Sequence, residues 1–219
     1  MDSIKGEKNA QPLSSNLYAE IQSDILSGRL ADNSKLTEQA ICKKYSVSRT
    51  PVREAFRQLE SDGLIDNIPN RGAFVTGLSK RDISDLFDLR SLFEVQASEW
   101  AIKRMTTEEI EALRETLEFM EFYTLRNDIE KVLVFNSQFH NILYIGTKDR
   151  LIQKALYTYQ TYLKHSAPAK TYSADQLKTI LDEHKAIFEA VETKNPAAGR
   201  KAMEDHMAQS KLRRISNYF

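Results

Sequence analysis

Apolar residues recur at helical spacing along most of this chain. The clearest case is segment 47–60, where one set of side chains repeats at i, i+3, i+4 and i+7 and predicts a helix with a single apolar face. This set is Val52, Ala55, Phe56 and Leu59. Ser48 is a good N-cap residue and Pro51 fits a first helical turn, so we expect the helix to begin near residue 49.

A basic strip lies beside the apolar face of this helix. Arg49, Arg53 and Arg57 follow one another four residues apart and therefore share one side of it. Shorter helical patterns precede the segment at 14–27 and at 37–45. Two short helices joined by a tight turn, of which the second carries basic side chains, predict a helix-turn-helix.

The residues after this motif predict a hairpin. Short apolar or β-branched runs at 64–68 and 73–76 flank the Pro-Asn-Arg-Gly sequence at 69–72, which is typical of a turn. A hairpin that follows a recognition helix is a wing, so residues 14–77 predict a winged helix-turn-helix domain. Residues 1–13 are mostly polar and lack a capping signal, and we expect a mobile N-terminus there.

From residue 78 onward the pattern is helical throughout. Apolar periods and capping residues predict helices at 79–100, 106–123, 129–145, 151–165, 174–193 and 196–216. The predicted fold class is therefore mainly α. A winged helix-turn-helix with a small β-hairpin wing is followed, over residues 78–219, by an all-α bundle of six to seven helices.

The charge of the chain is balanced, with 31 basic and 31 acidic residues, which excludes binding to nucleic acid by bulk charge. The segment between residues 43 and 57, however, contains five basic residues and one acidic residue, so its local net charge is +4 (five minus one). No apolar run approaches the ~20 residues of a membrane span, and the N-terminus lacks a signal-peptide pattern. We expect a cytoplasmic protein with no membrane partner. Cys42 is the single cysteine, which excludes an internal disulfide and a cysteine-rich zinc site.

Four sequence blocks resemble the winged-helix domain of GntR-type bacterial transcription regulators, namely residues 36–39, 47–55, 59–65 and 69–75. The resemblance implies that the domain binds double-stranded DNA at an operator. The residues that it places at the DNA are Gln39, Ser48, Arg49, Thr50, Arg53, Arg71 and Gly72. An arginine suits this role because it can donate two parallel hydrogen bonds to guanine O6 and N7. The alternative is that the arginines form an ordinary solvated face of the helix.

The second half resembles the FCD domain, the effector module of the FadR-like GntR subgroup. The resemblance is carried by residues 83–101 and, more loosely, by 136–140, 182–184 and 202–206. It implies a metal site whose ligands are Asn136, His140, His184 and His206, with Asn136 standing where the family pattern has Asp. Three imidazoles and one oxygen suit Zn²⁺, with Ni²⁺ or Mn²⁺ as alternatives.

Arg90 is the residue that the same resemblance assigns to the effector. Its guanidinium would grip the carboxylate of a small organic acid bound at the open metal position. The alternative is an ion pair with Glu94 four residues later, or with Asp85 or Glu99.

The sequence leaves three functions open. The leading one is a transcription regulator, with repression as the expected direction, that binds a palindromic operator as a homodimer and responds to a small carboxylate effector. The second is a metal-dependent enzyme acting on a small organic acid, for which Glu183 is the one candidate general base, poorly aimed because it is adjacent to His184. The third is an architectural DNA-binding protein without an effector.

Overall fold

The computed structural model describes residues 13–165 and 172–216. The chain divides into two compact units between Ser79 and Lys80. Most of the N-terminal segment that we expected to be mobile, residues 1–12, lies outside the described residues, and Leu13 already begins the first helix. No helix in the described part of the chain is long and apolar enough to cross a membrane.

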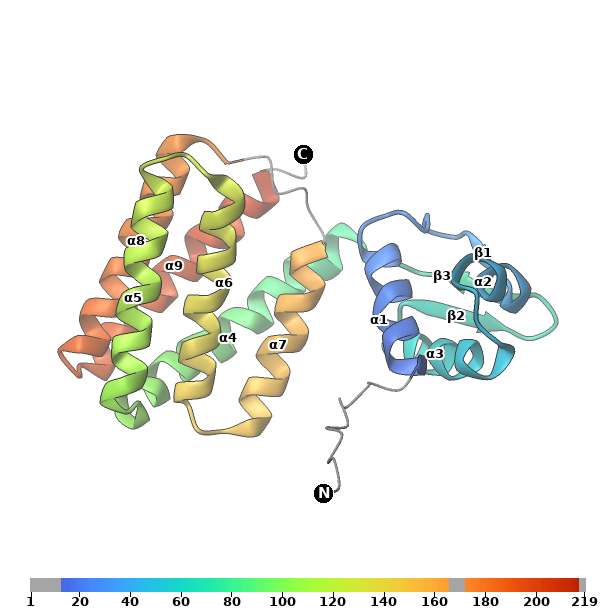
Figure 1. The fold of residues 1–219 in the computed structure, drawn as a ribbon, viewed down its shortest axis with the longest axis horizontal. Coiled ribbons are helices and arrows are strands. Elements are labelled where there is room, and N and C mark those ends of the chain that lie inside the picture. The colour runs from blue at the N-terminus through green and yellow to red at the C-terminus, as the bar shows by residue number, and fades with distance from the viewer. Residues whose placement is uncertain (1–12, 166–171, 217–219) are drawn as a thin grey trace, which may run out of the picture. The chain divides into compact units, whose positions relative to one another are not determined.

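The first unit contains three helices and a small sheet among its described residues (Figure 1). The elements are α1 (Leu13–Leu26), β1 (Lys35–Leu36), α2 (Glu38–Tyr45), α3 (Arg49–Ser61), β2 (Ile65–Ile68) and β3 (Gly72–Val75). The strands are antiparallel in the order β1-β3-β2. The predicted wing is the β2–β3 hairpin, with Ile65 opposite Val75. Strand β1 was not predicted, because two residues are too few to show an alternating pattern.

The core of this unit lies between α1 and α3. Ile21 of α1 and Val52, Ala55 and Leu59 of α3 are each 0% exposed, so the predicted apolar face of α3 is the surface that packs. Phe56 is only partly buried at the edge of this face. Because the apolar side of α3 faces inward, its basic side is left exposed.

Gly77 packs into the first unit near the predicted joint between the domains. Its φ is +65°, and a Cβ atom there would lie 2.1 Å from an oxygen of Asp32. A φ in this region favours glycine, and the contact with Asp32 places Gly77 in the packed first unit. The division between the units falls two residues later.

The second unit is a bundle in which the described residues form six helices (Figure 1). They are α4 (Lys80–Arg104), α5 (Thr107–Thr124), α6 (Ile129–Gly146), α7 (Arg150–His165), α8 (Ala174–Glu192) and α9 (Pro196–Ser216). Helix α4 packs along α9, α5 along α6, and α8 along α9. The mainly helical class, the wing and the helical second half are confirmed.

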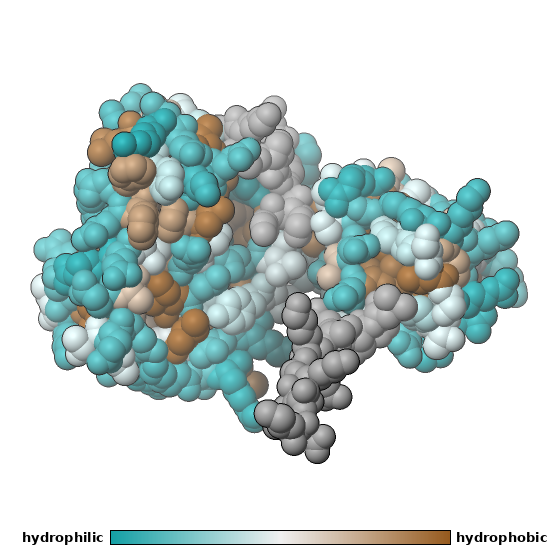
Figure 2. All heavy atoms as spheres, in the orientation of Figure 1, coloured by the Kyte–Doolittle hydropathy of each residue, from teal (hydrophilic) through white to brown (hydrophobic). Residues whose placement is uncertain are grey.

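Hydrophilic side chains cover most of the visible surface of each unit, and apolar patches interrupt them over α5 and α6 (Figure 2). Four large apolar side chains on these helices are about half exposed, namely Phe119, Phe122, Val134 and Ile145. The ring of Phe135 stacks on Phe119 and on Tyr123. The bundle therefore presents an aromatic surface between α5 and α6.

A buried carboxylate joins the first two helices of the first unit. Asp24 of α1 accepts hydrogen bonds from Arg29 Nε at 2.6 Å, from the Tyr45 hydroxyl at 2.6 Å and from Lys44 Nζ. Burial alone would raise the pKa of Asp24, but the hydrogen bonds from Lys44, Tyr45 and Arg29 outweigh it and lower the pKa to about 2. The ionised carboxylate thus holds α2 against α1.

We predict that Asp24→Asn lowers the free energy of unfolding by about 2 kcal/mol at pH 7, because a pKa shift of one unit corresponds to about 1.4 kcal/mol. Since the folded-state pKa is depressed, this stabilisation is present above the unfolded value of 3.8 and is lost as the pH falls toward 2. Urea unfolding at several pH values measures it. Asp66→Asn, at an exposed position on β2, is the control and should change stability by less than about 0.5 kcal/mol. Equal effects of the two substitutions would contradict the prediction.

Candidate functional site

Helix α3 presents its first turns to solvent. Arg49, Thr50 and Arg53 are exposed, as are Gln39 on α2 and Ser48 in the turn before α3. Ser46 has a φ of 55°, which ends α2 and redirects the chain into α3. Ser48 occupies the N-cap position of α3, although its hydroxyl makes no capping hydrogen bond. The predicted contact residues of the two helices are therefore accessible in one unit.

Arg53 is held by a neighbouring helix. Its Nε donates to Glu38 Oε1 of α2 at 2.7 Å, and this hydrogen bond is the main cause that lowers the pKa of Glu38. The Arg53 side chain is 59% exposed and the Glu38 side chain 34%, so the pair contributes little to stability. Arg53 can therefore exchange Glu38 for another acceptor at small cost.

The tip of the wing carries the other predicted contacts. Arg71 N donates to Ile68 O at 3.0 Å, and Asn70 has a φ of 62°, so Pro69 and Asn70 occupy the central positions of a type II turn. Gly72 follows with a φ of +98°. The exposed Arg71 guanidinium lies 5.6 Å from the centre of the Phe74 ring. The turn thus places a positive charge at the end of the hairpin.

Three histidines meet inside the bundle. His140 comes from α6, His184 from α8 and His206 from α9, and they are 0%, 0% and 3% exposed. One ring nitrogen of each lies within 4.8 Å of the others, and no second cluster of metal-binding side chains occurs in the described part of the chain. Asn136 lies one turn before His140 and lines the same pocket as His206.

Two of the histidine rings, those of His140 and His184, have one ring nitrogen without a hydrogen bond among the described residues. Nδ1 of His184 lies 2.7 Å from Ile180 O, and because a carbonyl only accepts, this nitrogen carries the proton. Nε2 of His184 and Nε2 of His140 are buried and have no hydrogen-bond partner among the described residues. Buried unpaired nitrogens of this kind are what a metal ion requires, so the residues fit the metal that the FCD resemblance implies.

Burial keeps two of these rings neutral. It is the largest cause that lowers the pKa of His184 well below its usual value. It also lowers the pKa of His206 to about 4, against the opposing hydrogen bond with Glu183. A neutral imidazole has a lone pair for a metal, which an imidazolium lacks. Both rings are therefore in the form that binds cations at neutral pH.

Glu94 is a buried carboxylate that contacts three side chains, one of which is His140 of the cluster. Its Oε1 accepts from Arg90 Nε at 2.9 Å, from Arg90 Nη2 at 2.7 Å and from the Tyr144 hydroxyl, while its Oε2 lies 3.1 Å from His140 Nδ1. Burial opposes the charge of Glu94, but His140 and Arg90 overcome this and hold the pKa of Glu94 well below its usual range. The i, i+4 ion pair that the sequence left open for Arg90 is therefore present.

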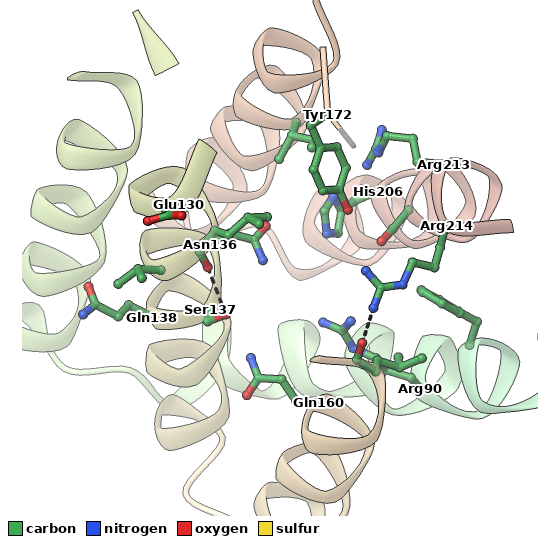
Figure 3. Close-up of a pocket in the computed structure, with 16 residues that line it drawn as sticks. Arg90, Glu130, Asn136, Ser137, Gln138, Gln160, Tyr172, His206, Arg213 and Arg214 are labelled. Carbon is green, nitrogen blue, oxygen red and sulfur yellow. Dashed lines mark hydrogen bonds between the residues drawn. The ribbon is translucent and has the colours of Figure 1, made fainter. Parts of the chain in front are cut away.

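A pocket of about 590 Å³ opens beside the histidines (Figure 3). Arginines from two helices and polar groups line it, among them Arg90, Asn136, Gln160, His206, Arg213 and Arg214. Its volume is that of a typical small-molecule site. Two of its three guanidinium groups, those of Arg90 and Arg213, also bind Glu94 and Glu183, and Gln160 and Asn136 add neutral donors and acceptors. The sequence did not predict three of these residues, namely Gln160, Arg213 and Arg214. They lie on two different helices, and no local sequence pattern shows that two helices line the same pocket.

Comparisons with known proteins agree with both units. Residues 13–75 match the model of the bacterial regulatory proteins of the gntR family, and residues 85–209 match that of the FCD domain. A Bacillus subtilis protein described as an uncharacterized HTH-type transcriptional regulator, YdhC, is 31% identical over 94% of this chain and 92% of that protein. The chain belongs to the GntR family. It is a transcription regulator of the subgroup with an FCD domain.

Two further relatives extend the comparison. The gluconate operon transcriptional repressor of Bacillus subtilis is 28% identical to this GntR-family regulator over 81% of the chain and 75% of that protein. The solved structure of E. coli McbR/YncC superposes with a TM-score of 0.75 and 18% identity, covering 96% of this chain and 100% of that one. This likeness supports the shared fold.

The enzyme alternative does not hold for this GntR-family chain. Glu183, the candidate base, is bound on both sides: its Oε2 lies 2.8 Å from His206 Nδ1, and Arg213 donates to Oε1 at 2.6 Å and to Oε2 at 2.7 Å. Because His206 and Arg213 already engage its two oxygens, Glu183 is a poor general base for a substrate. The family matches and relatives are likewise regulators.

The cluster predicts that tag-free protein carries close to one divalent metal ion per chain by elemental analysis. His184→Ala should lose it, because one of three imidazoles is gone, whereas Ser137→Ala, a pocket residue bonded to its own helix at Leu133 O, should retain it. Removal of the metal with a chelator should lower the unfolding midpoint, since a ligand at a hundred times its Kd stabilises a fold by about 2.7 kcal/mol. A metal-free protein with an unchanged midpoint would exclude the site.

Proposed function

We propose that this regulator is a repressor that binds a palindromic operator as a homodimer and releases it when a small carboxylate occupies the bundle pocket. The observation that carries the proposal is the juxtaposition of a histidine cluster suited to a metal with an arginine-lined pocket, since His206 belongs to both. A metal ion and a guanidinium are two groups that bind carboxylates strongly.

The DNA contacts divide by their chemistry. Arg49, Thr50 and Arg53 on the first turns of α3 would read base edges, where arginine can pair bidentately with guanine. Ser48 and Gln39 would contact the sugar-phosphate backbone of the DNA next to these bases. Arg71 and Gly72 at the wing tip would approach the phosphates or the minor groove, because glycine permits close contact and arginine adds charge.

A homodimer is proposed for two reasons. One recognition helix reads only a few base pairs, so a pair of helices on two half-sites is needed for specific binding. The exposed aromatic surface of α5 and α6, with Phe119 and Phe122, is an apolar area of the kind that marks protein interfaces. Two-fold symmetry of the protein would then match the palindrome.

The metal is proposed to be Zn²⁺, held by His140, His184 and His206, with the Asn136 amide oxygen as a fourth ligand. Nitrogen-rich sites favour Zn²⁺, Ni²⁺ and other borderline ions over Mg²⁺ or Ca²⁺. The amide lacks the negative charge of the family's aspartate, so the site has a lower affinity for hard ions such as Mn²⁺ than an aspartate site would. When bound, the metal supplies a positive centre for the carboxylate.

The effector is proposed to be a hydroxylated organic acid. Arg90 has two N–H groups on Nη1 beyond those that bind Glu94, and Arg214 faces the same pocket. Asn136, Ser137 and Gln160 can pair with hydroxyl groups. The name of the gluconate operon repressor is consistent with a sugar acid. Effector binding would shift the protein toward conformations that do not fit the operator.

We predict that Arg49→Ala abolishes specific operator binding in a gel shift and leaves the melting temperature unchanged, because the side chain is exposed. Arg53→Ala should act similarly, because a bidentate contact to a guanine edge contributes about 1–3 kcal/mol of discrimination. Arg150→Ala removes the same charge from an exposed position on α7 and serves as the control. Specific binding retained by both α3 variants would refute the assignment of the DNA surface.

For the effector, we predict heat of binding by calorimetry for at least one member of a panel of hydroxy, keto and sugar acids, and weaker operator binding in its presence. Arg214→Gln should reduce the affinity for that acid roughly 10- to 100-fold, the effect of losing a charged hydrogen bond of about 1.5–3 kcal/mol. Glu130→Gln, an exposed residue of the pocket rim, should not reduce it. A panel in which no acid binds and none changes operator affinity would disprove the effector proposal.

A further inference from the structure

Two of the clustered histidines face a carboxylate on the side away from the cluster. His140 Nδ1 lies 3.1 Å from Glu94 Oε2, and His206 Nδ1 lies 2.8 Å from Glu183 Oε2. The two carboxylates come from different helices, Glu94 from α4 and Glu183 from α8. The same arrangement therefore occurs twice around one histidine cluster.

An arginine fixes each of these carboxylates. Arg90 donates from Nε and Nη2 to Oε1 of Glu94, and Arg213 donates to both oxygens of Glu183. A guanidinium in a protein is always charged and only donates, so the carboxylate beside it remains an ionised acceptor. The histidine nitrogen that faces such an acceptor must carry the proton. Nδ1 is then the protonated nitrogen of His140 and of His206, and Nε2 has the lone pair.

His184 reaches the same tautomer by a different route. Its Nδ1 donates to the carbonyl oxygen of Ile180 on its own helix, at 2.7 Å. Three separate acceptors thus favour the tautomer with the proton on Nδ1 in all three rings. A histidine that merely packs in a core would be expected to pair both nitrogens, yet Nε2 of His140 and of His184 has no hydrogen-bond partner among the described residues.

We propose that Glu94 and Glu183 are positioning residues of the metal site: each holds its histidine with Nδ1 protonated and Nε2 available to the ion, and Arg90 or Arg213 holds the carboxylate. This inference rests on the proposed metal site. Carboxylates behind ligand histidines fix the ring orientation and raise the basicity of the ligand, and their loss typically lowers metal affinity 10- to 100-fold. Both arginines also line the pocket, so each chain of hydrogen bonds runs from the pocket wall to a ligand.

The first test is nitrogen NMR of the histidine rings in the full-length, metal-free protein at pH 7. The proposal predicts the Nδ1–H tautomer for His140, His184 and His206. In Glu183→Gln, His206 should lose its single tautomer because an amide can either donate or accept, whereas His184 should keep it because its acceptor is the backbone. An Nε2–H tautomer at His206 in the unchanged chain, or no change at His206 in the variant, would overturn the proposal.

The second test is Zn²⁺ affinity measured in competition with a chelator. Glu183→Gln, which is only partly buried, should bind Zn²⁺ 10- to 100-fold more weakly while circular dichroism shows it to be folded. Glu94→Gln should do the same where it folds. Glu130→Gln is the matched control, since this carboxylate lines the pocket and bonds to no histidine of the described chain.

The outcomes separate the two proposals. Equal affinity of the unchanged chain and of Glu183→Gln would overturn the positioning role while leaving the metal site standing. If the unchanged chain binds no Zn²⁺, the proposed metal site fails, and the positioning role fails with it whatever tautomers the NMR shows.

Discussion

A buried imidazole needs a partner for each ring nitrogen, and this bundle buries three imidazoles at one point. Glu94, Glu183 and the carbonyl of Ile180 satisfy the three Nδ1 atoms, but Nε2 of His140 and of His184 has no partner among the described residues. An unsatisfied buried group costs about 1–3 kcal/mol. A bound cation would remove this cost, because each unpaired Nε2 could then donate its lone pair to the ion.

The DNA-binding unit meets a different constraint, since its functional side chains must stay in water. Val52, Ala55 and Leu59 fix α3 on the core, which leaves Arg49 and Arg53 on the solvent side. Their charge is local, because the chain as a whole has equal numbers of acidic and basic residues. The local arginines, and not the net charge of the chain, must then supply the contacts to an operator.

The sequence predicted the elements better than it predicted their contacts. Helix periods and helix starts are local, so the helix that begins near residue 106 and the β2–β3 turn could be predicted directly. The two-residue β1 leaves no such pattern. Family resemblance singled out the three histidines, and the i, i+4 spacing of Arg90 and Glu94 suggested their pair. The bond between Glu183 and Arg213 joins residues 30 apart on two helices, and only packing brings them together.

The three Nε2 atoms are proposed to share one metal ion. Anomalous X-ray diffraction at the zinc edge, from crystals of protein purified without a histidine tag and without added metal, measures this. A shared ion gives a single strong anomalous peak per chain between His140, His184 and His206, about 2.1 Å from each Nε2. Clustered histidines with no peak between them, at the edges of zinc, nickel and manganese alike, would contradict it.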